Sequence, residues 1–218
     1  MHSGHRERLK AKFSNGELEP HELLELLLFY SIPRVNTNEL AHALINKCGG
    51  ISKVFSSPKS TLMEVDGIGE NSAVLIRTVG ELMGVCAQDN SCTDNMLTNR
   101  DRLYDYIKSI FFGQCREKTF MLMFSAKKRF IGQLQIGDGF YFQNQVLTYD
   151  AVAAAVRKKA KYVIIAHNHP NDVLMPSDTD METSNKINFA FENFGISVLC
   201  HFVVAQGSCV SYQNKMKI

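Results

Sequence analysis

The chain has 218 residues, of which 45% are apolar and 21% charged, and its net charge is +2. This composition is typical of a globular protein with one large or two small domains, and no apolar run reaches the roughly 18 residues of a membrane span. Up to residue 88, 9 basic residues stand against 10 acidic ones, and after it 15 stand against 12, so neither part has the basic excess of a protein that acts mainly on nucleic acid.

The six cysteines are scattered without a CxxC pair, and the charged N-terminus lacks the apolar core of a secretory signal. We therefore expect a cytoplasmic protein with reduced thiols, rather than a secreted disulfide framework. The cysteine spacing gives no support for a four-cysteine zinc site, and no membrane partner is expected.

Residues 1–85 are predicted to form an all-helical domain. Glu19-Pro20 opens an apolar run, with proline in the first turn and acids where the helix dipole favours them. Asn36 can cap the next helix. A further helical segment, from Leu62 to Gly84, contains two close glycines near its start.

Residues 86–98 are polar and aperiodic, which predicts a linker. The pattern then alternates between helices and strands, so residues 99–218 are predicted to form an α/β (α+β) domain. The expected helices cover 101–112, 149–159 and 178–194, and the expected strands cover 119–125, 130–136, 145–148, 162–166 and 196–205. Residues 143–150 are a candidate lining for a substrate groove.

The most informative segment begins with His167 and His169, directly after a buried strand. Side chains two apart on an extended segment point to the same face, so both imidazoles can reach one ion. Ser177 marks a helix start, and Asp180 on the first turn can face the strand end. Neutral imidazoles and a carboxylate suit zinc, and three protein ligands plus water is the pattern of a catalytic site.

Each part of this segment also has a purely structural interpretation. A histidine pair spaced by two is common in turns and on surfaces. Ser177 is a natural N-cap, and Asp180 at the third helical position completes a pattern like a capping box. Capping and metal binding are compatible with each other.

The spacing of His167, His169, Ser177 and Asp180 matches the JAMM (MPN-plus) metalloprotease motif without a gap. The strand leading into HNHP, and the PSxxD after it, resemble the RadC family of bacterial proteins over nearly the whole chain. The resemblance implies a JAMM/MPN-like mixed-sheet domain, similar to the cytidine deaminase fold, after an N-terminal helix-hairpin-helix region. It also implies that the two histidines and Asp180 bind Zn²⁺, and that Ser177 lies near the substrate oxyanion.

The JAMM pattern further implies a catalytic glutamate before the first strand of the domain, which here is Glu117. A carboxylate hydrogen-bonded to the activated water can take its proton and pass it to a leaving amine. The structural alternative is an exposed acid at the start of a strand.

The chain departs from the family pattern at two places. Asn171-Asp172 replaces the usual Ser-Gly after HNHP, which changes the turn without removing a ligand. Cys200-His201 replaces the usual Asp-His in the strand after the helix. The missing Asp could orient a ligand, and such partners matter roughly 10–100-fold. We interpret Cys200 as a buried thiol and His201 as a packed strand residue.

The segment from Leu62 to Ala73 resembles a helix-hairpin-helix, with Gly67, Ile68 and Gly69 at its turn. Glycines there permit a tight turn, and free amides at the start of the second helix can bind a phosphate. The alternative is a hairpin used for packing, and the flanking acids disfavour DNA. Any DNA binding should be weak and salt-sensitive.

Three functions remain open from the sequence. The first is a zinc metallohydrolase that cleaves a peptide or isopeptide bond of a protein substrate. The second is a DNA-associated module, for repair or recombination, with a structural or vestigial zinc site. The third is a nucleic-acid or nucleotide hydrolase, but the zinc deaminase signature H-x-E with P-C-x-x-C is absent. A second copy of the chain, in a homodimer, is a further candidate partner.

Overall fold

The computed structural model describes residues 3–33, 35–91, 96–138, 145–170, 173–205 and 207–212. The chain divides into two compact units, Met1–Met83 and Gly84–Ile218. Among the described residues, no helix has the length and apolar character of a membrane span.

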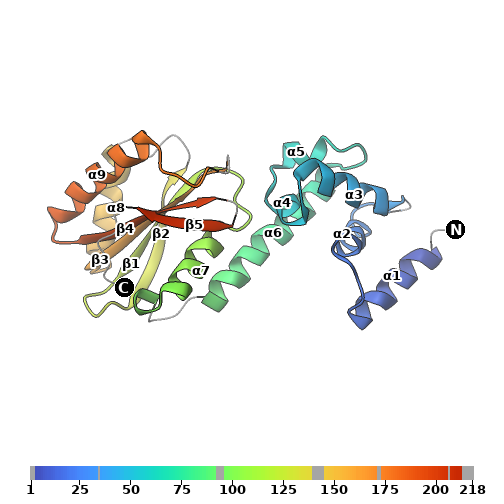
Figure 1. The fold of residues 1–218 in the computed structure, drawn as a ribbon, viewed down its shortest axis with the longest axis horizontal. Helices are drawn as coiled ribbons and strands as arrows, with labels where there is room; N and C mark the ends of the chain where they lie inside the picture. Colours follow the sequence, from blue (N-terminus) through green and yellow to red (C-terminus); the bar gives the residue numbers. More distant parts are fainter. Residues whose placement is uncertain are drawn as a thin grey trace. The chain divides into compact units, whose positions relative to one another are not determined.

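The first unit is helical, as expected (Figure 1). Its core consists of apolar side chains on successive helices, including Leu24, Leu28, Leu44, Leu62 and Ile76. The helices are α1 (Ser3–Asn15), α2 (Pro20–Leu28), α3 (Thr37–Cys48), α4 (Ile51–Ser56), α5 (Lys59–Met63) and the first part of α6 (Glu70–Ser91).

The expected caps and turns of this unit are present. The Asn36 side chain accepts a hydrogen bond from the Asn38 amide at the start of α3, which confirms the N-cap. The turn between α5 and α6 contains Gly67, whose φ of 91° lies in the left-handed region. A Cβ at Gly67 would lie 3.0 Å from Leu40 Cδ2, which a small shift of that flexible side chain relieves, so it is the backbone conformation that favours glycine.

The irregular linker expected over residues 86–98 is wrong for most of its length. Helix α6 continues to Ser91, and Met96–Thr98 forms a short 3₁₀ helix, η1. No proline interrupts α6, and the side chains of Met96 and Leu97 are buried in the core of the second unit. Residues 92–95 lie outside the described part of the chain.

The second unit is a five-stranded mixed sheet with helices on both faces, which confirms the α/β class (Figure 1). The strands are β1 (Lys118–Phe124), β2 (Phe130–Asp138), β3 (Tyr162–Asn168), β4 (Ser197–Ala205) and β5 (Ser208–Tyr212), in the order β2-β1-β3-β4-β5. Strands β3 and β4 are parallel, and the other neighbours are antiparallel.

Alternation along the strands creates two cores. Phe124, Ile164 and Phe202 pack with α7 (Arg100–Ile110) on one face. On the other face, Val163 and Ile165 pack with α8 (Gln145–Arg157) and α9 (Asp178–Glu192). Because side chains alternate, each position on β3 and β4 belongs to only one of these two layers.

Two sequence expectations in this unit need correction. The strand expected at residues 145–148 is instead the first turn of α8, because a short apolar run does not by itself separate strand from helix. Strand β5 was not expected. It pairs antiparallel with β4 at the edge of the sheet.

The topology brings three segments together at one end of the sheet. Since β1 runs antiparallel to β3, the start of β1 lies beside the end of β3, where Thr119 pairs with His167. Helix α9 begins after this end and returns the chain to β4. The end of β3, the start of β1 and the start of α9 can therefore form one site.

Candidate metal centre

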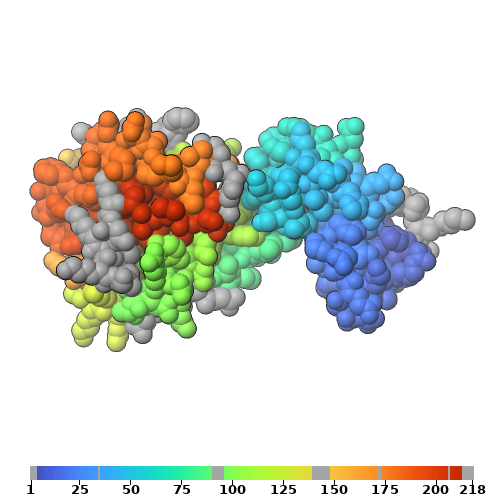
Figure 2. All heavy atoms as spheres, in the orientation of Figure 1, coloured from blue at the N-terminus to red at the C-terminus, as the bar shows by residue number. Residues whose placement is uncertain are grey.

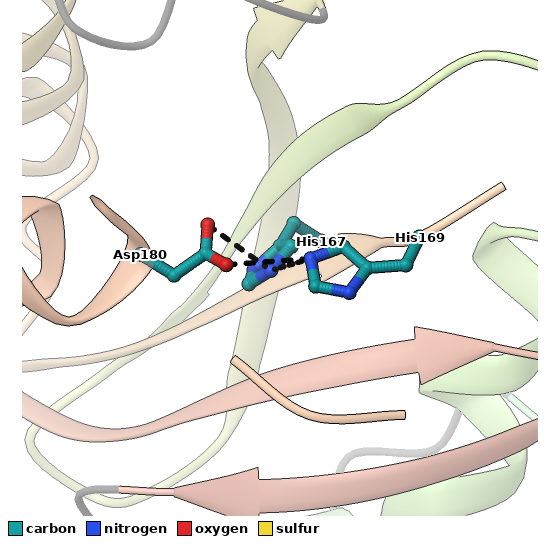
Figure 3. Close-up of side chains that lie close together, drawn as sticks. All are labelled: His167, His169 and Asp180. Carbon is teal, nitrogen blue, oxygen red and sulfur yellow. Dashed lines mark hydrogen bonds and ion pairs between the residues drawn. The ribbon is translucent and has the colours of Figure 1, made fainter. Parts of the chain in front are cut away.

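Three side chains converge at the carboxyl end of β3 (Figure 3). His167 is on β3, and His169 follows it, with its amide donating to the Val204 carbonyl at 2.9 Å so that the chain continues beside β4. Asp180 is on the first turn of α9. Among the described residues, these three form the one group of His, Cys, Asp and Glu side chains whose ligand atoms are close enough to share an ion.

The distances between ligand atoms fit a tetrahedral ion. The two Nε2 atoms of His167 and His169 are 3.0 Å apart, and they lie 3.5 and 3.4 Å from the Asp180 carboxylate oxygens. Around zinc, with bonds of about 2.0–2.1 Å, neighbouring ligand atoms lie about 3.3 Å apart. His167 lies near Oδ1 and His169 near Oδ2 of Asp180, so the three residues offer three ligand groups to one ion, one fewer than a tetrahedral site takes.

A hydrogen bond sets the orientation of the His169 ring. Its Nδ1 lies 2.8 Å from the Val173 carbonyl oxygen, which can only accept, so Nδ1 carries the proton. The Nε2 lone pair then faces His167 and Asp180. Two imidazole nitrogens and a carboxylate directed at one point are unfavourable without a cation or a shared proton between them, and this donor set suits a divalent metal.

Asp180 is fixed by the start of its own helix. The Ser177 amide and hydroxyl donate to Asp180 Oδ2 at 2.7 and 2.6 Å, and the Asp180 amide lies 3.2 Å from Ser177 Oγ. Partial burial by itself raises the pKa of Asp180, but the hydrogen bonds from His167 and Ser177 outweigh it and hold that pKa below its usual value. The carboxylate is therefore ionised and ready to bind a cation.

Ser177 is the N-cap of α9 and forms a capping box with Asp180. The structural interpretation of this pair is confirmed, and it coexists with the metal geometry because the same carboxylate also faces the two histidines. The role of Ser177 at a substrate oxyanion stays a prediction.

Glu117 precedes β1 and is partly buried. Its neighbours are tied to the segment that carries the histidines. Asn168 accepts from the Lys118 amide at 2.8 Å and donates to the Arg116 carbonyl at 3.0 Å. In the described structure no hydrogen bond or ion pair joins Glu117 to the three ligand residues, so its role as a base stays a prediction.

Asn168 makes structural contacts at the site that the sequence did not reveal. It lies between the two histidines, and its buried side chain binds the backbone on both sides of Glu117. Its amide thereby takes the place of a strand-to-strand backbone hydrogen bond at the start of β1. The sequence carried no clear signal for this contact, because the partners are about fifty residues apart.

A buried polar network supports α9 beside the site. Ser184, one turn after Asp180, lies 2.9 Å from His201 Nδ1 and 3.1 Å from the Tyr212 hydroxyl. Burial raises the pKa of Tyr212 to about 12, so the phenol stays protonated and can donate. The Tyr212 ring also meets the His167 ring edge to face, at 6.3 Å between centroids. His201 is therefore packed in its strand, as expected, and in addition ties β4 to α9.

Cys200 lies in the opposite layer from this network. Its side chain is fully buried in the core that packs with α7, and burial raises the pKa of its thiol. The interpretation as a buried thiol is confirmed. The idea that a side chain at this position orients a metal ligand is wrong for this structure, because strand alternation directs it away from the histidine face. The five cysteines in the described residues are all free.

The residues expected to bind nucleic acid are at the turn between α5 and α6. The Ile68 side chain is 4% exposed and belongs to the core of the helical unit, and its amide donates to the Val65 carbonyl at 3.0 Å. The Gly69 carbonyl accepts from Ala73 and begins α6. The Ile68 side chain and amide thus serve the fold, and DNA binding by Gly67, Ile68 and Gly69 stays a prediction.

Two expectations concern residues outside the described structure. Asn171 and Asp172, where the chain departs from the family loop, are not described. The same holds for residues 143–144 of the suggested substrate groove.

Comparison with known proteins places this site in a family. The family model described as RadC-like JAB domain matches residues 97–217. A UPF0758 protein of Fusobacterium nucleatum is 30% identical over 219 residues, covering 96% of this chain and 94% of the relative. A UPF0758 protein of Shewanella baltica is 28% identical over 212 residues, covering 97% and 94%. Neither name states an activity.

Proposed function

The chain belongs to the RadC family, with a RadC-like JAB domain, and on this premise we propose that it is a zinc-dependent hydrolase of the JAMM type that cleaves a peptide or isopeptide bond. The observation that carries the proposal is the convergence of three ligand groups, from His167, His169 and Asp180, at distances suited to one ion. A structural zinc site would fill all four positions with protein ligands.

A zinc ion held by these residues would act as a Lewis acid and make a water molecule nucleophilic near neutral pH. The protein's own contribution is orientation. The Val173 carbonyl fixes the His169 ring, and Ser177 fixes the Asp180 carboxylate. Because these partners are part of the backbone or of a helix cap, little reorganisation is needed during the reaction.

Glu117 is the proposed general base. It takes the proton of the attacking water and returns it to the leaving amine nitrogen, so that proton transfer balances over the two steps. The pairing of Thr119 with His167 and the Asn168 contacts support this role, because they hold the backbone on either side of Glu117 beside the end of β3. Ser177 is the proposed donor to the oxyanion of the substrate carbonyl. For this its hydroxyl turns away from Asp180 Oδ2, which still accepts from the Ser177 amide at 2.7 Å.

A DNA-associated role of the helical unit is the second candidate. The left-handed φ of Gly67 favours it, since a helix-hairpin-helix turn needs such a residue. Asp66 and Glu70 flank this turn, and Lys59 is already paired with Glu70 at 2.7 Å. Hydrolysis by the second unit therefore has the stronger support.

Amide hydrolysis tests the proposed function directly. Zinc-loaded protein should release new amino groups from peptide or isopeptide-linked substrates, and His169→Ala should lose this activity because one metal ligand is gone. The measurement is amine release followed by mass analysis of the products. Hydrolysis that persists in His169→Ala would contradict the proposal.

Replacing Asn168 by alanine should impair turnover while leaving the metal in place. The variant loses both contacts that hold the backbone beside Glu117, so kcat should fall by roughly 10–100-fold, with about one zinc retained per chain. Asn168→Asp keeps an oxygen that accepts from the Lys118 amide, so its kcat should fall less than that of Asn168→Ala. Equal kcat in wild type and Asn168→Ala, at equal zinc content, would argue against the positioning role.

A further inference from the structure

Three turns meet at the end of the sheet that lies opposite the metal centre. The Lys161 amide donates to the Phe124 carbonyl at 2.8 Å, and the Ser197 amide donates to the Lys161 carbonyl at 3.0 Å. These bonds join the β1–β2 turn, the α8–β3 turn and the α9–β4 turn. We call residues 125–129, 157–161 and 193–197 the basic edge.

The basic edge carries cations without acids. Seven of the chain's 24 Lys and Arg residues lie in it, and it contains no Asp or Glu. Since the whole chain has a net charge of +2, the remaining residues sum to 2 − 7 = −5. All seven side chains are exposed: Lys127, Lys128, Arg129, Arg157, Lys158, Lys159 and Lys161.

These cations are available to a ligand. Within the described residues, the three cations of the β1–β2 turn and those at 157–159 make no ion pair with an acid, whereas Lys161 donates to the Gly195 carbonyl at 2.7 Å. Favourable interaction with the α8 dipole explains one or two of the cations at 157–161. It does not explain the cations of the β1–β2 turn, which lies on the surface, in yellow, in Figure 2.

The basic edge also contains one exposed aromatic residue, Phe194. Phe194 is 59% exposed, and the contact between Lys161 and Gly195 holds the adjoining backbone beside the lysine. The other apolar residues of the basic edge are small or buried, as Ala160 and Ile196 are. One exposed aromatic among several cations fits a stacked base with neighbouring phosphates better than a lipid surface, which would take several inserted apolar side chains.

We propose that the basic edge binds single-stranded nucleic acid, with its lysines and arginines on the phosphates and Phe194 stacked on a base. This surface goes beyond the proposed hydrolysis and is separate from the α5–α6 turn. It binds single strands of any sequence, because phosphate contacts and stacking do not distinguish one base from another. It also leaves the metal centre, at the other end of β3, free for a substrate.

The test is fluorescence anisotropy of a labelled oligothymidine of roughly 20 nucleotides, titrated with the full chain between about 50 and 200 mM salt. Lys127→Glu/Lys158→Glu should lower the affinity at least about tenfold and reduce the salt slope by about 1.4. Arg102→Glu/Lys186→Glu is the matched control, because it changes net charge equally at exposed residues elsewhere in the same unit. Its affinity should stay within about twofold of wild type.

Phe194→Ala separates stacking from charge. It should weaken binding to the single strand by roughly 5–100-fold and leave binding to a duplex of the same length unchanged. Circular dichroism and zinc content check that each variant is folded, and Lys127→Ala/Lys158→Ala replaces the reversed pair if that pair misfolds. The alanine pair removes two positive charges without reversing them, so its loss of binding free energy for the oligonucleotide should be about half that of the glutamate pair.

Four results would overturn the proposal. The first is that the wild type does not bind the oligonucleotide at the lowest salt, and the second is that the basic-edge pair and the control pair lose affinity equally. The third is that Gly67→Val loses binding completely. The fourth is that the wild type binds phosphatidylserine vesicles but not the oligonucleotide. The third would assign binding to the helical unit, and the fourth would assign the basic edge to a membrane surface.

Discussion

The wild-type chain should bind about one zinc ion per molecule, and Asp180→Ala should lose it. Asp180 is the charged ligand of the site, and its oxygens lie 3.5 and 3.4 Å from the two imidazole Nε2 atoms. Structural zinc sites with four protein ligands bind the ion with a free energy of about 10–16 kcal/mol. If each ligand contributes about a quarter of that free energy, losing one weakens zinc binding by about a hundredfold or more. Elemental analysis after dialysis against a weak chelator measures the change.

The controls separate metal binding from helix capping. Asp178→Ala removes an exposed acid from the same turn of α9 and should keep the zinc. Asp180→Asn retains an oxygen that can accept from the Ser177 amide, so α9 should still begin normally while zinc binding weakens. Stoichiometric zinc in Asp180→Ala would show that the three-ligand assignment is wrong.

Glu117→Gln should strongly reduce turnover without loss of zinc. The amide has nearly the shape of the carboxylate but cannot accept the proton of the attacking water, so kcat should fall by about 10²–10⁴-fold. Steady-state amide hydrolysis, with zinc measured on the same samples, provides the comparison. This pattern differs from that of the ligand variants, in which metal and activity disappear together.

Glu182→Gln is the matched control for this variant. It changes an exposed acid on α9 that is not part of the group of His167, His169 and Asp180, and its kcat should equal that of the wild type. Full activity in Glu117→Gln would mean that another group accepts the proton. Loss of zinc in Glu117→Gln would instead place Glu117 among the ligands.

The local sequence was sufficient to predict the three candidate ligands. His167 and His169 share a face because they are two apart on an extended segment, and Asp180 sits at a helix start that Ser177 caps. Such relations depend on the geometry of a strand and of a helix turn, which a short stretch of sequence encodes. The buried strand before them and the helix after them were predictable for the same reason.

Short or ambiguous segments were predicted less well. Residues 145–148 have a strand-like composition but form the first turn of α8, because they continue into an alanine-rich helix. Residues 86–91 are polar, yet they extend α6. Strand β5 is an edge strand whose pairing with β4 is a tertiary contact, and edge strands are weakly marked in sequence.

The sequence by itself therefore determined the α/β class, the family and the three candidate ligands, since each of these follows from periodicity or from a local motif. Only the tertiary structure decided which distant groups meet. It placed Asn168 beside the start of β1, joined Ser184 to His201 and Tyr212, and gathered the basic edge from three separate turns. The physical reason is that strand order and register bring together residues about fifty positions apart in the chain. Local propensities do not encode that order.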